Sequence, residues 1–333
     1  MSDTTTATPA PAAPAPAGVL TARARRRVPE LAGLVIVLLA LCAFFALSSP
    51  YFLNKDNLVN VLAAVAVTGI VAAPGTLLLV AGHLDLSVGS AAAFCGAVLA
   101  VRARDASLAE GIALAIMAGV AIGMLNGFVT TVVGVSSLIT TIGTLAIFRG
   151  LTQVLTDGQT VNVADFNGLG NARPLFDVPL PVFLFAGVMV LFWLLMRFTT
   201  YGRSMYAIGA NPVAARLVGI RGRGAVFAAF ALTGACVALA GLVIASQVGS
   251  ATPQAASGLE ISVITAIVLG GASLTGGRGT VVGTVLGLLI IGVLNNGLVL
   301  LDVGSFWQDV ARGSLLVLAV SFDRLRARFD SSN

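Results

Sequence analysis

Charged residues are scarce in this chain, and lysine is almost absent. Only 10% of the 333 residues are charged, and Lys55 is the single lysine among 19 lysine and arginine residues. A soluble domain carries about 25% charge, so a soluble globular fold is excluded. A phosphate-binding P-loop needs a Gly-Lys-Ser/Thr sequence, whereas Lys55 stands in F-L-N-K-D-N. If ATP drives any activity here, the ATPase must be another polypeptide.

Cysteine and histidine are also rare, which argues against an enzyme or a metal protein. Cys42, Cys95 and Cys236 lie far apart inside apolar runs, and His83 is the only histidine. All four side chains would have to converge to form a four-ligand zinc site. The sequence contains neither G-x-S-x-G nor H-E-x-x-H. We therefore predict no catalytic residue, no metal site and no bound cofactor.

Long apolar segments are what the sequence has in abundance. Hydrophobic residues make up 57% of the chain, and the mean hydropathy is +0.99. Apolar segments that are continuous rather than alternating predict α-helices across a lipid bilayer and not a β-barrel. We expect an all-α integral membrane protein with about ten transmembrane helices, at residues 31–47, 58–81, 86–101, 110–133, 137–155, 181–197, 225–247, 259–275, 280–301 and 306–322.

The arginines predict the orientation of these helices. Clusters at Arg23–Arg27, Arg197–Arg223 and Arg324–Arg328 flank apolar segments, and cytoplasmic loops carry the excess of Lys and Arg. Without an accompanying aromatic surface they do not indicate nucleic-acid binding. Ten spans place all three clusters in the cytoplasm, together with Arg278, and leave Arg102, Arg104 and Arg173 outside as exceptions.

The same reasoning divides the chain into three parts. Residues 1–28 begin with a low-complexity stretch of Thr, Ala and Pro, which predicts a disordered cytoplasmic tail. Residues 29–323 form the transmembrane domain, and residues 324–333 form a cytoplasmic C-terminal tail. Both termini are therefore expected in the cytoplasm of a plasma-membrane protein.

A carboxylate interrupts the apolar sequence at G-H-L-D-L-S-V-G, residues 82–89. Gly82 and Gly89 bracket a break between two helices, and non-helical backbone inside a membrane occurs only where it lines a cavity or packs into protein. Asp85, with Ser87 beside it, either caps the following helix or belongs to a translocation pathway. His83 beside Asp85 is also compatible with a proton relay.

A second glycine-dense break lies at residues 270–280, which begin with Gly270 and Gly271. Farther along, the amides of Asn295 and Asn296 either face a polar lumen or form hydrogen bonds between helices. Glu260 is expected at an external helix start, where its charge suits the helix dipole.

The loop at residues 198–224 is the one long polar interruption that looks suited to docking a partner. Asn211 is a good N-cap, Pro212 suits the first helical position, and Gly219 suits the stop. This predicts a helix of roughly two turns that carries Arg216. It either presses against a soluble partner or is an ordinary capped loop helix.

Three stretches resemble one family. They are G-H-L-D-L-S-V-G-S at 82–90, Y-G-R-S-M-Y-A-I-G-A-N-P-V-A-A-R-L-V-G-I at 201–220, and the glycine-rich segment at 268–298. In this order they are similar to the permease subunits of sugar ABC importers of the ribose, xylose and arabinose type. His83 replaces a residue that is usually glycine in that family, and Ser262 stands where acidic residues are common.

The resemblance implies an assembly in the inner membrane of a bacterium. Two permease copies, identical or different, would bind two ABC ATPase subunits, and an extracytoplasmic solute-binding protein would deliver a sugar or similar small polar solute. Asn211 to Gly219 would form the coupling helix, with Ala214, Ala215 and Arg216 as its contacts. The breaks at 82–90 and 270–279 would be corresponding points of an internal inverted repeat.

Two other functions remain open at this stage. An ion-coupled secondary transporter would use Asp85 and His83 as its proton site, but it would not explain the capped helix at 211–219. A membrane scaffold or receptor without transport is the third possibility, and ATP-dependent uptake that resists an uncoupler would discriminate among the three.

Overall fold

The structure is a computed structural model. It describes residues 27–163 and 166–304 and, near the C-terminus, residues 306–311, 313–315, 317–318 and 321. The tails expected at 1–28 and 324–333 lie outside the described residues, apart from the first two residues of a helix that begins at Arg27. The arginine cluster at 324–328 lies outside them too.

Helices make up most of the described chain, as the apolar sequence predicts. The only strands are β1 (Val161–Asn162) and β2 (Ser250–Ala251), which pair in antiparallel fashion within the described part. The helices are α1 (Arg27–Ser48), α2 (Lys55–Val80), α3 (Val88–Asp105), α4 (Leu108–Phe128) with a π-helical end at Val129–Val133, α5 (Ser137–Thr156), α6 (Gly168–Asn171), α7 (Leu180–Phe198), α8 (Thr200–Ala210), α9 (Pro212–Leu217), α10 (Gly222–Val248), α11 (Leu259–Leu269) and α12 (Val281–Leu300).

The expected number of ten spans is not confirmed. Seven described helices are long and apolar enough to cross a membrane: α1, α2, α4 with its π-helical end, α5, α7, α10 and α12. The last turn of α3 carries Arg102 and Arg104. The expected span at 259–275 is shorter, since α11 ends at Leu269, where two glycines follow. The expected span at 306–322 lies partly outside the described residues.

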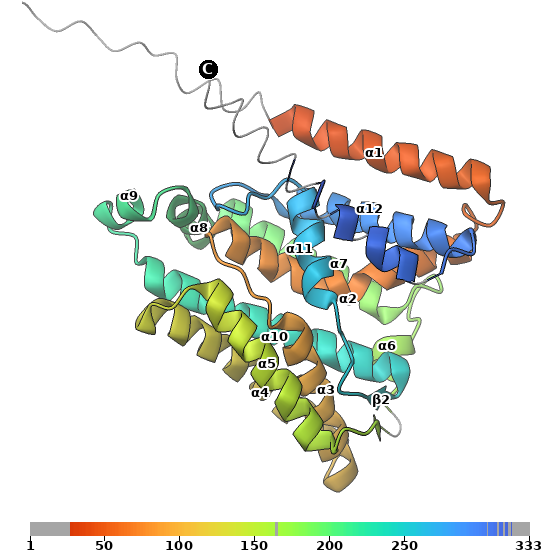
Figure 1. Ribbon diagram of the computed structural model, residues 1–333, viewed down its shortest axis with the longest axis horizontal. Helices are drawn as coiled ribbons and strands as arrows, with labels where there is room; N and C mark the ends of the chain where they lie inside the picture. The colour runs from red at the N-terminus through yellow and green to blue at the C-terminus, as the bar shows by residue number, and fades with distance from the viewer. Residues whose placement is uncertain are drawn as a thin grey trace, which may run out of the picture.

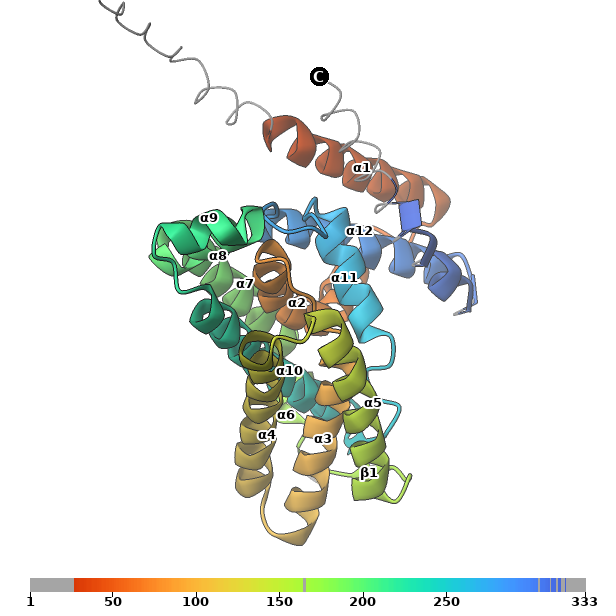
Figure 2. The same ribbon diagram turned by 60° about the vertical axis from the view of Figure 1, so that its left-hand side comes forward.

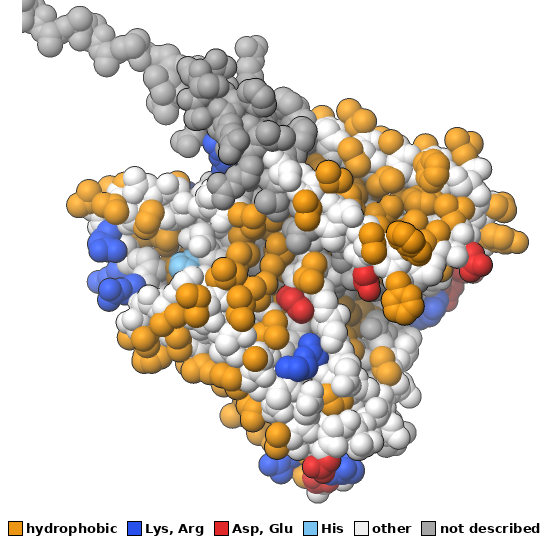
Figure 3. Space-filling view, viewed as in Figure 1, with side chains coloured by type: hydrophobic (Ala, Val, Ile, Leu, Met, Phe, Trp, Pro, Cys, Tyr) orange, Lys and Arg blue, Asp and Glu red, His pale blue; other side chains and the backbone are white. Residues whose placement is uncertain are grey.

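The two ends of the helix bundle differ in what they carry. At one end, α8 and α9 lie beside the 270–280 segment, which holds Arg278, so the basic segments at 197–223 and 278 share one end as predicted. At the other end lie α6, the two short strands and the turn between α3 and α4 (Figures 1 and 2). Lys and Arg side chains gather at both ends (Figure 3).

An inverted repeat is visible in the packing, but its register differs from the expected one. α3 packs against α4 and α10, and α11 packs against α12 and α2. α2 and α4 run toward the α9 end, whereas α10 and α12 run away from it. The triplet α2–α3–α4 therefore recurs, inverted, as α10–α11–α12.

This register corrects the expected correspondence between the two breaks. Gly82 and Gly276 touch each other at the same end of the bundle, whereas corresponding points of an inverted repeat near the membrane surfaces lie at opposite ends. In the observed register the break after α2 corresponds to the segment between α10 and α11. Each of these two connections contains a glycine with a positive φ, which is Gly82 (84°) in the first and Gly249 (71°) in the second.

Glycines allow α4 and α10 to approach until their backbones touch. A methyl group on Gly119 would lie 2.6 Å from the carbonyl oxygen of Gly234, and one on Gly123 would overlap the carbonyl oxygen of Phe230. Small residues four apart are the usual means of close helix packing in lipid. The spacing of Gly119, Gly123 and Gly127 is therefore explained by packing.

We predict that Gly234→Ala destabilises the bundle, because its methyl group would overlap the carbonyl oxygen of Gly119. Overpacking of this kind costs about 1–3 kcal/mol, so the apparent Tm in detergent should fall by several degrees. Gly143→Ala is the matched control, since nothing lies within 4 Å of its added methyl group. Equal melting temperatures for the two variants would contradict the packing assignment.

Candidate functional site

The segment from His83 to Leu86 is neither helix nor strand, and α5 supplies partners for its backbone. The amide of Leu84 donates to Ser137 Oγ at 3.3 Å, and the amide of Leu86 donates to Thr141 Oγ1 at 3.1 Å. Unpaired backbone groups are costly in hydrocarbon. The hydroxyls of Ser137 and Thr141 in α5 therefore stabilise the non-helical conformation of this segment.

Asp85 belongs to a hydrogen-bonded chain at the start of α3. Its Oδ1 accepts hydrogen bonds from the Ser87 amide at 2.9 Å and from Ser87 Oγ at 2.6 Å. Ser87 Oγ accepts in turn from Asn126 Nδ2 of α4 at 2.9 Å. The carboxylate thus satisfies an orphan amide before the helix and ties α3 to α4.

These contacts place Asp85 in a turn just before α3 and not at its N-cap, which is Ser87 and has no side-chain capping bond. His83 lies with its ring 6.2 Å from that of Phe230, and among the described residues no hydrogen bond joins it to Asp85. The pair therefore lacks the direct link that a proton relay would use. Gly82 has the left-handed conformation that the break requires.

Glu260 is the carboxylate whose surroundings differ most from the sequence-based expectation. Its Oε2 is buried and has no hydrogen-bond partner among the described residues. It packs against Gly89, where any side chain would overlap it. The eleven residues of α11 span only about 16 Å, so Glu260 lies well inside the bundle and not at an external helix start.

The segment before α11 is held by a basic residue that sequence reasoning missed. Arg149 of α5 donates to the carbonyl oxygens of Pro253 at 2.5 Å and Ala255 at 3.0 Å. An arginine in the middle of an apolar segment was the available signal, because such residues pair inside the bundle. Together Arg149 and Glu260 mark a polar position at depth between α5, α3 and α11.

The second break brings three distant segments together. The Gly277 amide donates to the carbonyl oxygen of Val80 at 2.8 Å, and Tyr206 Oη of α8 donates to the carbonyl oxygen of Gly279 at 2.8 Å. A methyl group on Gly209 would lie 2.6 Å from the Gly277 nitrogen and would overlap the Val80 oxygen. The end of α8 therefore sits directly on both breaks.

The other predicted glycines of this break have separate roles. Gly270 packs backbone to backbone against Gly283 of α12, and Gly271 turns the chain with a φ of 88°. Gly287 packs in the same way on Ala266. These contacts allow α11 and α12 to pack closely against each other.

The two adjacent asparagines of α12 are in different environments. Asn296 exchanges two hydrogen bonds with Asn57 of α2, at 2.8 and 2.9 Å. This is the bonding between helices that was the alternative to a lumen position. Asn295 Oδ1 is buried without a hydrogen-bond partner in the described part of the chain.

The loop helix has the form that the sequence predicts. Asn211 Oδ1 accepts from the amides of Val213 and Ala214, both at 3.0 Å, so it is the N-cap of α9. Gly219 ends the helix with a φ of 83°. Ala214 and Arg216 are exposed, whereas Ala215 is buried in the main core.

The exposed face of α9 is more apolar than its sequence suggested. Val213, Leu217 and Val218 are 66%, 83% and 77% exposed. No arginine of the 197–223 segment has a salt bridge within the described residues. The preceding helix α8 was also missed, although Thr199 caps it and its buried positions Met205 and Ile208 have helical spacing.

We predict that Ser87→Ala lowers the apparent Tm more than Ser90→Ala does. Loss of Ser87 Oγ leaves the buried Asn126 amide without its acceptor, at a cost of about 1–3 kcal/mol. Ser90 is a matched control one turn away, since it is buried and its hydroxyl bonds only the Ser87 carbonyl oxygen. Thermal unfolding in detergent measures both, and a Ser90→Ala loss as large as that of Ser87→Ala would count against the network.

The chain is similar in sequence to a known family of transport proteins. The family model described as "Branched-chain amino acid transport system / permease component" matches residues 57–320. No solved structure matches the chain. Groups of three or more residues able to hold a metal ion are absent from the described residues.

Curated relatives match over most of their length. The ribose import permease protein RbsC of Escherichia coli (strain K12) is 38% identical over 296 residues, which cover 87% of this chain and 92% of that protein. RbsC of Bacillus subtilis (strain 168) is 38% identical over 311 residues, covering 90% and 94%. The L-arabinose transport system permease protein AraH of Escherichia coli (strain K12) is 37% identical over 305 residues, covering 91% and 93%. The chain therefore belongs to the family of membrane-spanning permease subunits of sugar ABC importers, in the branch that includes the ribose and arabinose permeases.

Proposed function

We propose that this chain forms the pathway through which a pentose sugar or a similar small polar solute enters a bacterial cell, and that a separate ABC ATPase drives the movement by gripping α9. The solute class rests on the similarity to relatives named for ribose and arabinose. The chain itself lacks a P-loop lysine, so ATP is bound and hydrolysed by the partner.

The surface of α9 is the observation that carries this proposal. A capped helix with three exposed apolar side chains and an arginine without a salt bridge stands at the end of a membrane bundle. Exposed apolar residues beside a charge are typical of a protein interface. Val213, Ala214, Arg216, Leu217 and Val218 are the proposed contacts, and the buried Ala215 seats α9 on the bundle.

The contacts of α8 give α9 a mechanical route into the membrane. α8 adjoins α9 in the chain, and its residues Tyr206 and Gly209 touch the 277–279 segment and the end of α2. A displacement of α9 by the ATPase would therefore move both breaks together. Rigid contact between packed elements transmits such a shift because close-packed interiors do not deform gradually.

Two polar atoms inside the bundle are the proposed contacts with the passing solute. Glu260 Oε2 and Asn295 Oδ1 are without hydrogen-bond partners in the described chain, whereas Asp85, Ser87 and Asn296 are engaged in structural bonds. Sugar hydroxyls are suited to such acceptors. A second permease copy and an extracytoplasmic solute-binding protein complete the proposed importer, with α9 and both chain termini on the cytoplasmic side.

We predict that Arg216→Glu weakens association with the ATPase subunit. Reversal of an exposed interface charge disfavours docking without altering the bundle. Co-purification of the ATPase with the permease should fall about tenfold, and uptake into vesicles should fall with it. Arg173→Glu, which changes the same charge at the opposite end, should leave both unchanged. Normal ATPase association of Arg216→Glu would argue against α9 as the docking helix.

We also predict that Gly209→Ala separates ATPase binding from transport. Its methyl group would overlap the carbonyl oxygen of Val80, so α8 would no longer sit on the two breaks while α9 stays exposed. ATPase co-purification should persist, and ATP-dependent sugar uptake should fall about tenfold. Gly224→Ala is the control, because its methyl group meets nothing within 4 Å. Wild-type uptake by Gly209→Ala would eliminate this route of coupling.

A further inference from the structure

An apolar crevice runs along the bundle on the side formed by α3, α4 and α5. Its volume is about 590 Å³. α3 lies between α4 and α5, which diverge toward the end remote from α9 (Figure 2). Its lining includes Phe94 and Arg102 of α3, Met117 and Ala118 of α4, and Val154 of α5.

The crevice opens sideways toward the surroundings of the bundle. Met117 and Val154 on its two walls are 65% and 75% exposed. Both walls belong to helices long and apolar enough to cross a membrane. The opening therefore faces the hydrocarbon of the bilayer or another membrane-embedded chain.

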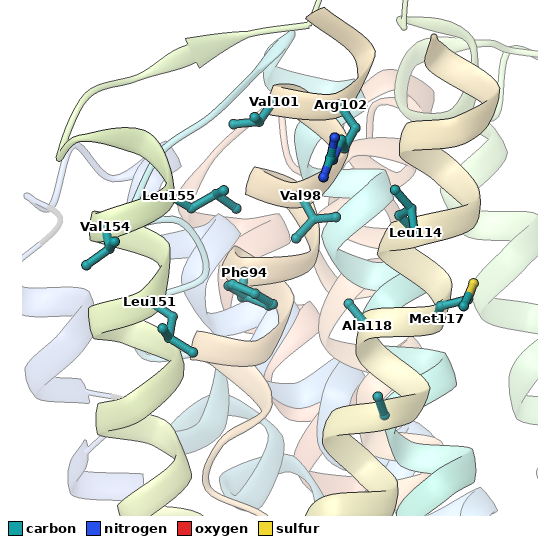
Figure 4. A pocket seen from close by; sticks show the side chains of 11 residues that line it. Phe94, Val98, Val101, Arg102, Leu114, Met117, Ala118, Leu151, Val154 and Leu155 are labelled. Atoms are coloured by element: carbon teal, nitrogen blue, oxygen red, sulfur yellow. The ribbon is translucent and has the colours of Figure 1, made fainter. Parts of the chain in front are cut away.

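A single charged residue lines this crevice, at its outer end. Arg102 lies in the last turn of α3, and its guanidinium turns into the crevice toward Val98 and Leu114 (Figure 4). No carboxylate is among the lining residues. The neighbouring Arg104 is paired with Asp105 at 2.8 Å, whereas Arg102 forms no salt bridge with any described carboxylate.

The depth of the lining residues matches the cross-section of one membrane leaflet. Arg102 lies one turn before the end of α3, where the chain turns into α4. Phe94 lies eight residues earlier, which is about 12 Å deeper along a helix. One half of the hydrocarbon core is about 15 Å thick. The crevice therefore extends from the level of lipid phosphates toward the level of acyl-chain ends.

We propose that this crevice binds one glycerophospholipid from the leaflet remote from α9, with an acyl chain between α4 and α5 and the phosphate on Arg102. Lipid hydrocarbon is as apolar as the crevice, so burial of the chain alone gives no preference over bulk lipid. The selectivity comes from the guanidinium, which forms strong charge-assisted hydrogen bonds with phosphate oxygens. The occupant is thus distinguished by its phosphate.

The test measures the phospholipid that stays with the full-length protein. Wild-type protein and single variants are purified from bacterial membranes in mild detergent and examined by native mass spectrometry with added palmitoyl-oleoyl phosphatidylglycerol. Wild-type and Arg104→Gln should each retain one phospholipid per chain, while Arg102→Gln should retain about fivefold less. Arg104→Gln removes the same charge two residues away and leaves the crevice unchanged.

A second pair of variants tests the apolar part of the crevice. Ala118→Phe should fill the space between α4 and α5 and release the phospholipid, whereas Ala113→Phe, on the same helix but outside the lining, should not. Unchanged melting temperatures establish that each variant is folded. Diacylglycerol, which has the chains but no phosphate, should not compete with phosphatidylglycerol.

Three results would overturn the proposal. They are equal retention by wild-type protein and Arg102→Gln, absence of any retained phospholipid in the wild-type protein, and equal binding of diacylglycerol. Efficient disulfide crosslinking between copies carrying Met117→Cys and Val154→Cys would also overturn it, since a second chain would then fill the crevice.

Discussion

Backbone groups that leave a helix need new hydrogen-bond partners wherever packed protein or lipid excludes water, and this restricts where the chain of a membrane protein can break. Here the break after α2 takes its partners from the hydroxyls of Ser137 and Thr141 and from Asp85. The break after α11 takes a partner from the end of α2, through the Gly277 amide and the Val80 oxygen. Each irregular segment is thus bonded to another element, so neither can shift without its neighbours.

The need for backbone hydrogen-bond partners also joins the segments at the α9 end of the bundle to one another. Gly209 and Tyr206 place α8 on the two segments where helical hydrogen bonding is interrupted. Elsewhere, glycine contacts such as those between α4 and α10 lock helices together along their length. The bundle therefore combines tightly packed helix pairs with one junction at which several segments depend on a few hydrogen bonds, and α9 projects from that junction.

Much of this arrangement follows from local sequence signals. Apolar continuity predicts the membrane helices, and Asn211, Pro212 and Gly219 predict α9 to within two residues at its end. Long-range facts could not be obtained in this way. That Glu260 lies against Gly89, that Gly209 lies on Val80, and that Asn296 bonds Asn57 are consequences of tertiary packing between segments far apart in the chain. The predicted register of the inverted repeat was wrong for the same reason. The sequence shows two similar glycine-rich breaks, but it does not show whether they are equivalent positions of a repeat or segments that touch each other.

The central position of α2 has a consequence for biosynthesis. About two thirds of its membrane-crossing stretch is buried inside the bundle, and its packing partners are α7, α8, α10, α11 and α12, all of which are translated later. The hydrogen bonds between Asn57 and Asn296 and between Thr76 and Thr284 join residues more than 200 positions apart in the sequence, so they form only after α12 has been made. When α2 first enters the membrane, these groups have only the partners nearby in the chain, since Thr76 Oγ1 donates to the carbonyl oxygen of Ala72 and Asn57 Nδ2 to that of Phe52. Assembly of this subunit therefore cannot finish helix by helix from the N-terminus, because the bonds from Asn57 and Thr76 to other helices form only after α12 has been translated.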